Sequence, residues 1–150
     1  MSRWRPSVTV AAVIERGGKF LFVEEMANGR RVLNQPAGHL DPGESLVQAV
    51  AREVLEETAH RFAPTALLGV YRWRYDKEDV TFLRFAFLGR VEGVEAGRSL
   101  DKEIIAAVWL TPAELAARRA EHRSPLVQQC VDDYLAGRSF SLDALSKPYA

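Results

Sequence analysis

Residues 38–60, GHLDPGESLVQAVAREVLEETAH, constrain the fold of this chain more than any other stretch. They open with a loop, residues 38–43, in which Asp41-Pro42-Gly43 is typical of a turn. Residues 44–58 contain no Gly or Pro, and Ala, Leu, Glu and Arg predominate among them. These residue types favour helix. The sequence therefore predicts a loop that leads directly into a helix.

The predicted helix carries its acidic side chains on one stripe. At about 100° per residue, Glu53, Glu56 and Glu57 fall within an arc of roughly 100°. A second stripe is apolar and must face the core, and its centre lies only about 80° from the acidic stripe. This apolar stripe consists of Leu46, Val47, Val50 and Val54. The acids therefore border the buried side of the helix.

This arrangement leaves the carboxylates short of positive charge. Carboxylates three and four positions apart repel one another, and they lose screening by water near a protein body. Arg52 is the only Lys or Arg between residues 44 and 60. A hard divalent cation would supply the missing charge, and Mg²⁺ held by a few carboxylates plus substrate phosphates fits best, with Mn²⁺ as the second choice. The alternative interpretation is an acidic helix that faces solvent.

The same residues carry a resemblance to a known family. Gly38, Glu44 and the run RE-VL-EE at 52–57 are spaced as in the signature of the Nudix hydrolases, Gly-x5-Glu-x7-Arg-Glu-U-x-Glu-Glu-x-Gly-U, where U is a bulky aliphatic residue. Six fixed matches at set spacing arise by chance roughly once in ten million starts. Ala59 replaces the expected Gly and His60 the expected aliphatic residue, and both concern the exit of the helix more than the metal ligands.

The resemblance implies an enzyme and assigns roles to the residues of the signature. Members of this family are Mg²⁺-dependent hydrolases of a diphosphate linked to another group. By resemblance, Glu53, Glu56 and Glu57 hold the metal, the carbonyl of Ala37 is a further ligand, and Arg52 orients a carboxylate. An ordinary pair of Arg52 with Glu56, four residues on, predicts nearly the same geometry.

Other roles remain open between alternatives. The first choice for the general base is Glu53 and the second is Glu103, which lies where many members carry an additional acidic metal ligand. A solvated loop acid is the alternative for Glu103. Glu44 is expected to act structurally or behind the metal ligands, and Gly38 belongs to the loop that precedes them.

Two further blocks resemble the NudJ phosphatase branch of the family. They are residues 33–40, LNQPAGHL, and residues 123–127, RSPLV. This resemblance implies hydrolysis of nucleoside di- and triphosphates and of hydroxymethylpyrimidine or thiamine diphosphates, with release of inorganic phosphate. One alternative is a pyrophosphatase that cuts ADP-ribose, nucleotide sugars or dinucleotides. Another is a non-catalytic ligand sensor with the Nudix fold.

Residues outside the signature must select the substrate. The amides of Asn34 and Gln35 lie beside the metal loop, although they also suit turn-stabilising hydrogen bonds. Arg72 and Arg74 share one face of a predicted strand, where they could meet phosphates, and aromatic side chains that could stack on a ring share the other face. Plain sheet packing is the alternative. Arg84 interrupts an apolar run, so if buried it needs a phosphate or a carboxylate.

The rest of the chain predicts an α+β fold. Strands are expected at 8–14, 20–23, 31–33, 66–73, 80–88 and 104–110, and the turn Gly17-Gly18 is expected to pair the first two as a hairpin. Asn28-Gly29 predicts another turn. Thr111 to Glu114 and Ser124-Pro125 predict two later helices, the second ending before Gly137. We expect one mixed sheet between helical layers, which agrees with the α/β/α sandwich that the resemblance implies.

Size and composition limit the remaining functions. The chain has 150 residues, 47% of them hydrophobic, which fits a single domain over residues 1–150. A formal net charge of zero argues against a surface for nucleic-acid polymers or anionic membranes, so the expected partner is a small phosphorylated molecule. No stretch reaches the length of a membrane span. Cys130 is the single cysteine and is expected to be buried, which favours a cytoplasmic protein. Both a monomer and a homodimer remain open.

Overall fold

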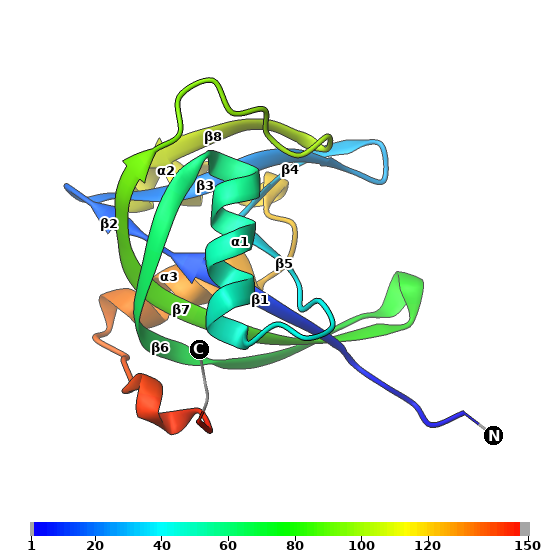
Figure 1. The fold of residues 1–150 in the computed structure, drawn as a ribbon. Helices are drawn as coiled ribbons and strands as arrows, with labels where there is room; N and C mark the ends of the chain where they lie inside the picture. The colour runs from blue at the N-terminus through cyan, green and yellow to red at the C-terminus, as the bar shows by residue number, and fades with distance from the viewer. Residues whose placement is uncertain (1, 148–150) are drawn as a thin grey trace.

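The computed structural model describes residues 2–147 and consists of strands with three α-helices at their sides (Figure 1). The strands are β1 (Ser7–Val13), β2 (Glu15–Arg16), β3 (Lys19–Ala27), β4 (Arg30–Asn34), β5 (Ala37–His39), β6 (His60–Tyr75), β7 (Val80–Val94) and β8 (Ile104–Leu110). The helices are α1 (Leu46–Thr58), α2 (Pro112–Ala117) and α3 (Leu126–Leu135), with short 3₁₀ turns η1 (Asp76–Glu78), η2 (Arg119–Glu121) and η3 (Leu142–Ala144).

The strands form two sheets. One has the order β5-β1-β7-β6 and is mixed, because β1 runs parallel to β7 while the other neighbours are antiparallel. The other contains β2, β3 and β4, with β8 paired to β3, and is antiparallel. The α+β prediction with a mixed sheet between helices is confirmed, but the strands are divided between two sheets and not collected in one.

The predicted pairing of the first two strands is wrong. Only the two residues of β2 pair with β3, across the turn at Gly17-Gly18, whereas β1 pairs with β5 and β7. The chain passes from one sheet to the other at Ile14, whose carbonyl accepts a hydrogen bond from the N–H of Leu21 at 3.0 Å. The turn at Asn28-Gly29 is confirmed, since it joins β3 to β4 with positive φ at both residues.

The helix α1 begins two residues later than predicted and has well-defined ends. Ser45 caps its start, and Gln48 bonds back to Ser45 in a capping box. The end of the helix explains why the family signature has a glycine at the position of Ala59. Ala59 adopts φ +60°, and its N–H donates to Leu55 O at 2.9 Å. A left-handed C-terminal residue is usually glycine, and a side chain there costs roughly 1 kcal/mol.

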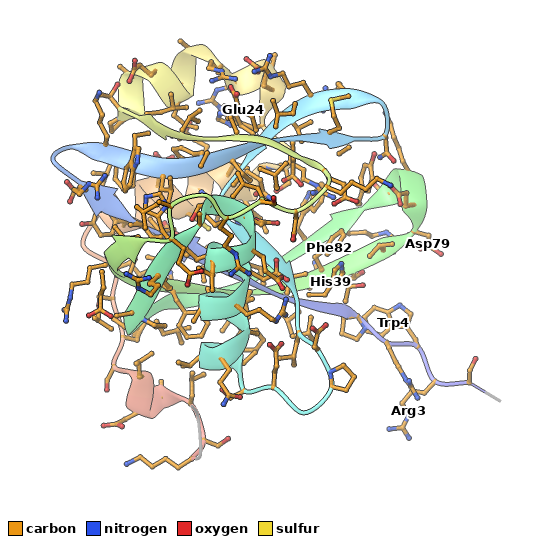
Figure 2. All side chains as sticks on the ribbon, turned by 45° about the horizontal axis from the view of Figure 1, so that its top comes forward. Arg3, Trp4, Glu24, His39, Asp79 and Phe82 are labelled. Atoms are coloured by element: carbon orange, nitrogen blue, oxygen red, sulfur yellow. The ribbon has the colours of Figure 1, made fainter. Side chains whose placement is uncertain are left out.

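The long hairpin β6–β7 exceeds its predicted length at both ends. Its register shifts at three places between residues 61 and 69, and such irregularities hide the alternation that identifies a strand in sequence. The 3₁₀ turn η1 joins the two strands, and Asp79 lies near the tip of this hairpin (Figure 2). Arg3 and Trp4 lie on the N-terminal segment, which extends away from the body of the protein.

The core lies on both faces of β1, β3 and β7. Val10, Ala12 and Ile14 pack on the side of α1, whereas Val13 packs on the side of α3. The caps predicted for α2 are present, because Thr111 and Glu114 form a capping box. Gly137 follows α3 with φ +85°, as predicted. No helix of residues 2–147 combines the length and the apolarity needed to cross a membrane.

Candidate active site

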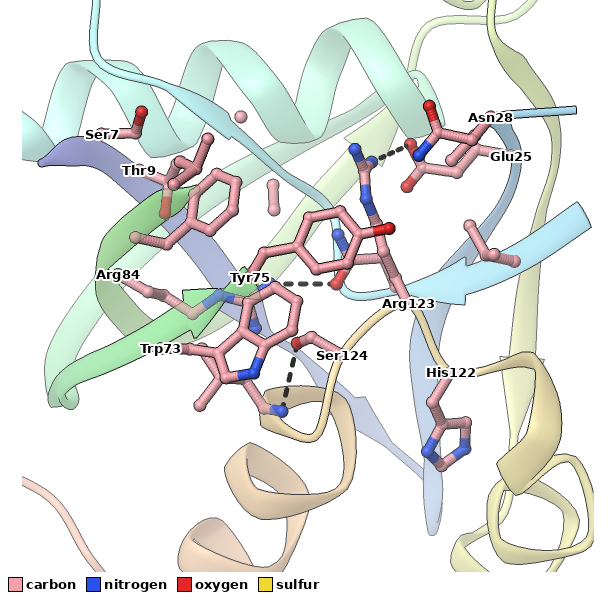
Figure 3. A pocket seen from close by; sticks show the side chains of 18 of the residues that line it. Ser7, Thr9, Glu25, Asn28, Trp73, Tyr75, Arg84, His122, Arg123 and Ser124 are labelled. Carbon is pink, nitrogen blue, oxygen red and sulfur yellow. Dashed lines mark hydrogen bonds and ion pairs between the residues drawn. The ribbon is translucent and has the colours of Figure 1, made fainter. Parts of the chain in front are cut away.

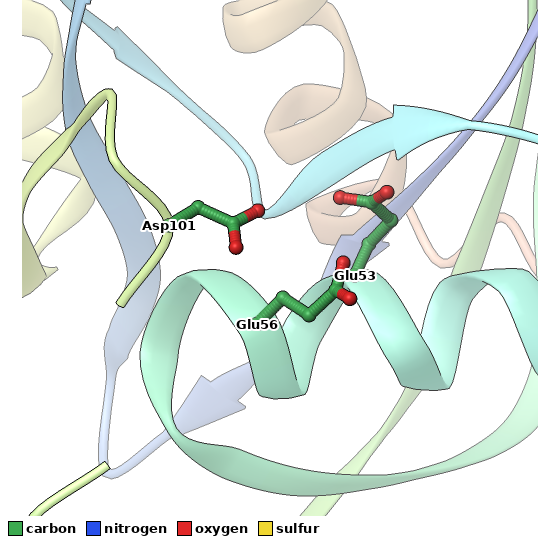
Figure 4. A group of neighbouring side chains, drawn as sticks. All are labelled: Glu53, Glu56 and Asp101. Atoms are coloured by element: carbon green, nitrogen blue, oxygen red, sulfur yellow. The ribbon is translucent and has the colours of Figure 1, made fainter. Parts of the chain in front are cut away.

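Three carboxylates meet at the C-terminal half of α1. Each of Glu53, Glu56 and Asp101 offers an oxygen atom, and these atoms lie within 4.8 Å of one another (Figure 4). The two glutamates come from one face of α1, and Asp101 comes from the segment before β8. The N–H of Asp101 donates to Glu56 O at 3.0 Å, which fixes this segment against the helix.

Arg52 links the acids of α1 to the loop before it. Its Nη1 donates to Glu53 Oε1 at 2.7 Å and to Glu56 Oε1 at 3.0 Å. Its Nε and Nη2 bind both carboxylate oxygens of Glu44, and Nη2 also donates to the carbonyl of His39 at 3.0 Å. Arg52 therefore orients several carboxylates at once, and the pair with Glu56 is one of these contacts.

Gly38 leaves the space that Glu53 occupies. A Cβ atom on Gly38 would lie 2.1 Å from Glu53 Cδ and within 2.4 Å of both carboxylate oxygens. Gly38 belongs to the short strand β5, which pairs with β1 opposite Val10. Gly38, the first glycine of the signature, is therefore required by the close approach of its backbone to the Glu53 carboxylate. Its backbone conformation does not require glycine, since its φ does not lie in the left-handed region.

Glu57 and Glu53 are the most buried of these acids. Glu57 accepts a hydrogen bond from the N–H of Ala37 at 2.9 Å, but its burial dominates and raises its pKa to about 9. Burial likewise raises the pKa of Glu53 to about 6, although the hydrogen bond from Arg52 opposes this shift. Nearby cations favour the charged form of a carboxylate, so a bound metal ion would favour ionised Glu53 and Glu57.

The acid predicted near β8, Glu103, lies at the cleft described below but outside the group of three carboxylates. Glu103 is exposed. Asp101, two residues earlier, belongs to that group, and burial raises its pKa above the ordinary value. The sequence DKE at 101–103 identifies the segment, but which of its acids lies beside Glu53 and Glu56 depends on how the loop packs against α1.

A cleft of about 1290 Å³ opens beside these carboxylates (Figure 3). Its lining includes Glu53, Glu57, Ala37 and Gly38. Trp73 and Phe82, from the hairpin β6–β7, line another wall, and their rings stack with centroids 5.8 Å apart and an interplanar angle of 14°. Arg123 and Ser124, from the segment before α3, also line the cleft.

The predicted substrate residues divide into two groups. Asn34 and Arg84 line the cleft, and Gln35 lies buried beside Arg84. Arg72 and Arg74 do not line it, because they alternate with Trp73 on β6 and point to the opposite face. Arg74 instead binds Asp76 at 2.9 Å and also contacts Asp79.

Two residues of the cleft were missed at the level of sequence. Glu25 is buried on β3, lines the cleft near Glu57 and binds Arg123 Nη1 through its Oε1 at 2.8 Å. The pair joins residues 98 positions apart. The sequence shows two acids directly after the apolar run FLFV at residues 24–25, but it indicates neither that Glu25 is buried nor that Arg123 is its partner.

The carboxylates suit a hard divalent cation. All the donors are oxygen atoms, their spacing brings three carboxylates to one point, and Arg52 alone does not balance their charge. Glu53, Glu56 and Asp101 would hold such an ion, with Glu57 and the carbonyl of Ala37 beside them. An oxygen-rich site of this kind can bind Mg²⁺ or Mn²⁺ together with phosphate oxygens.

Comparisons with known proteins agree with this site. Residues 3–130 match the family described as NUDIX domain. The chain is similar to phosphatase NudJ of Escherichia coli (strain K12) and of Shigella sonnei (strain Ss046), with 37% identity to each over 142 residues, 95% of this chain and 92% of theirs. A NUDIX hydrolase from Nitrosomonas europaea has 51% identity and a TM-score of 0.93, over 95% of this chain and 97% of that one. This chain therefore belongs to the Nudix family and is a hydrolase that acts on phosphoanhydride bonds.

Proposed function

We propose that the protein is a Mg²⁺-dependent phosphatase that hydrolyses nucleoside di- and triphosphates or hydroxymethylpyrimidine and thiamine diphosphates, releasing inorganic phosphate. The observation that carries this proposal is the meeting of Glu53, Glu56 and Asp101 beside a cleft that Glu53 lines. The similarity to phosphatase NudJ supports the choice of a phosphatase.

The residues of the site divide the work of hydrolysis between them. Glu53, Glu56 and Asp101 would hold the metal, with Glu57 and the Ala37 carbonyl as additional ligands. When bound, the metal would polarise phosphoryl oxygens and neutralise developing charge. Arg52 keeps Glu53 and Glu56 in place through its two Nη1 hydrogen bonds.

A general base must remove a proton from the attacking water. Glu53 is our first choice because it belongs to the carboxylate group, lines the cleft and is held by Arg52. Glu103 is the second choice, since it lines the same cleft. Replacing each by Gln and measuring the pH dependence of kcat tests the choice, because only the loss of the base removes the acidic limb of the profile.

The central experiment replaces Glu56 by Gln. We expect Glu56→Gln to abolish Mg²⁺-dependent turnover, because an amide cannot replace the charge of a metal-binding carboxylate. Glu92→Gln is the matched control, since Glu92 is an exposed acid on β7 outside the cleft. Wild-type activity in Glu56→Gln would contradict the proposed site.

The alternative function is a pyrophosphatase acting on ADP-ribose, nucleotide sugars or dinucleotides. The wide cleft, with Trp73 and Phe82 on one wall, would also admit a ring from such a substrate. Product analysis separates the two functions. Orthophosphate from a nucleoside diphosphate supports the phosphatase, whereas a nucleoside monophosphate from ADP-ribose supports the pyrophosphatase. Binding without any turnover would support a ligand sensor.

We also propose that the single domain acts in the cytoplasm on small molecules, as a monomer or homodimer. The buried thiol of Cys130 and the balanced net charge support this setting. Gel filtration with light scattering measures the assembly state.

A further inference from the structure

Arg84 is a buried cation inside the cleft. It extends from β7, its residue is 6% exposed, and it lines the cleft with Asn34 and Trp73. Among residues 2–147 it is the one Lys or Arg that is buried. A guanidinium in such a place normally has a carboxylate beside it, because burial of an uncompensated charge is costly.

The hydrogen-bond partners of Arg84 are all neutral. Nη1 donates to Gln35 Oε1 at 2.8 Å and lies 3.8 Å from Cys130 Sγ, and Nη2 donates to Asn34 Oδ1 at 2.9 Å. Burial raises the pKa of the Cys130 thiol, so it stays protonated at neutral pH. Within the part of the chain that the structure describes, no carboxylate forms an ion pair with Arg84.

The surrounding residues fix Arg84 and leave donors free. Gln35 Nε2 donates to Val127 O at 2.8 Å, so its Oε1 is held toward Arg84. Asp133, a nearby acid on α3, accepts instead from the hydroxyl of Tyr71 at 2.7 Å. Arg84 uses three of its five N–H groups in the contacts above. The other two have no partner among residues 2–147, so they can donate to a ligand in the cleft.

The position of Arg84 separates it from the carboxylates. In the sheet, Arg84 lies opposite Thr9, and Thr9 lies opposite His39, so the backbone of Arg84 is about two strand spacings, ~10 Å, from β5. Gly38 faces Glu53, and its neighbours on β5 face the other way with Thr9 and Arg84. The cleft touches both faces of this edge strand, since its lining includes Glu53 and Arg84.

The wall beside Arg84 is aromatic. Phe82 shares the face of Arg84 on β7, and Trp73 lies opposite Phe82 on β6. Trp73 also stacks on Tyr75, with ring centroids 5.4 Å apart and an interplanar angle of 18°. An anion at Arg84 would therefore lie next to a flat apolar surface that suits a ring.

We infer that Arg84 binds a phosphoryl group of the substrate, separate from the phosphorus that the carboxylates approach. Three parts of the substrate then bind at three places: its ring lies beside Trp73, and its terminal phosphoryl group lies at the carboxylates. The phosphoryl group that remains on the product after hydrolysis binds Arg84. This inference rests on the proposed function only in placing the terminal phosphoryl group at the carboxylates. The phosphoryl group at Arg84 would supply the negative charge that Arg84 lacks among its neutral hydrogen-bond partners.

Binding of nucleoside monophosphates without metal tests this inference. Calorimetry in EDTA compares adenosine, cytidine, guanosine and uridine with their 5′-monophosphates. We expect wild-type protein to bind at least one monophosphate about ten- to a hundred-fold more tightly than its nucleoside, the range typical of hydrogen bonds to charged groups. Arg84→Met should bring this ratio to about one, while nucleoside affinity is retained.

Three variants make the result specific. Arg90→Met is the matched control, because Arg90 is an exposed arginine on the same strand and outside the cleft, and it should keep the wild-type ratio. Arg84→Lys keeps the buried charge and so guards against misfolding of Arg84→Met. It should lower the ratio by several-fold, since an ammonium lacks the forked donors of Arg.

The outcomes separate this inference from the proposed function. A folded Arg84→Met or Arg84→Lys with the wild-type ratio would overturn the inference, as would a wild-type protein that binds no monophosphate or shows no preference over the nucleoside. Turnover with Mg²⁺ is measured separately. An inactive protein with the preference intact would count against the proposed function alone.

Discussion

Replacing Gly38 by Ala tests the central geometry of the site. The new Cβ would lie 2.1 Å from Glu53 Cδ, while ordinary contacts begin at 3.4 Å, so the carboxylate must move by about 1.3 Å. Arg52 holds this carboxylate at 2.7 Å, and Glu53 is buried, so the shift breaks a hydrogen bond in a confined space. Misplacement of a reacting group by about 1 Å lowers turnover on the order of 10²-fold.

The assay is release of inorganic phosphate from a nucleoside diphosphate at saturating Mg²⁺, together with urea unfolding. We expect kcat of Gly38→Ala to fall about 10²-fold. The free energy of unfolding should fall by about 1–3 kcal/mol, the usual cost of overpacking, which leaves the variant folded for the activity assay. The φ of Gly38 is not positive, so the backbone itself accepts alanine.

Gly93→Ala is the control for this experiment. A Cβ there would lie 2.4 Å from Arg61 Nη2, but this atom ends a flexible and half-exposed side chain that can swing into solvent. We therefore expect nearly wild-type turnover. Full activity in Gly38→Ala would refute the idea that contact between β5 and Glu53 positions the carboxylates of the proposed metal site.

Two further predictions follow from the structure. Asp101→Asn should raise the Mg²⁺ concentration needed for half-maximal activity by about 10-fold or more, because it removes one of three converging carboxylates; an unchanged metal requirement would exclude Asp101 as a ligand. Burial alone would raise the pKa of Glu24, but hydrogen bonds from Arg31 and Arg118 outweigh it and lower the pKa below its ordinary 4.5. Ionised Glu24 therefore contributes stability that is present above pH 4.5 and lost as the pH falls through the lower folded-state pKa. Urea midpoints of Glu24→Gln should lie below wild type at pH 7, and the difference should narrow below pH 4.5; a constant difference would contradict the role of the charge.

Local sequence determined the elements that hold the site. The turn and helix at residues 38–58 follow from local propensity, and helical spacing alone places Glu53, Glu56 and Glu57 on one stripe next to the core. The structure agrees, since Glu53 and Glu57 are buried at the edge of this helix. Capping of α2 was also predictable, because its cap lies within four residues.

Predictions failed where a residue's partner lies far along the chain. The pairing of β1 with β7 was not predicted because a strand carries no local sign of its neighbour. Likewise, the position of Asp101 beside Glu53 and Glu56 was not predicted, because it depends on a backbone hydrogen bond from Asp101 to Glu56, 45 residues earlier. The sequence identified the segment, and the packing of its loop against α1 places Asp101 beside the two glutamates.

The division between sequence and tertiary structure has a physical cause. The spacing of side chains along one helix is set by helical geometry. The sequence alone therefore determined which acids of α1 share a stripe and where the loop before them lies, and it predicted that they suit a divalent cation. The convergence of Arg84, Asn34 and Trp73 on one cleft depends on which strands pair and which face each strand turns inward. Burial of the whole core decides those pairings, and so only the tertiary structure could show that a buried arginine faces the cleft without an ion pair to any carboxylate of residues 2–147.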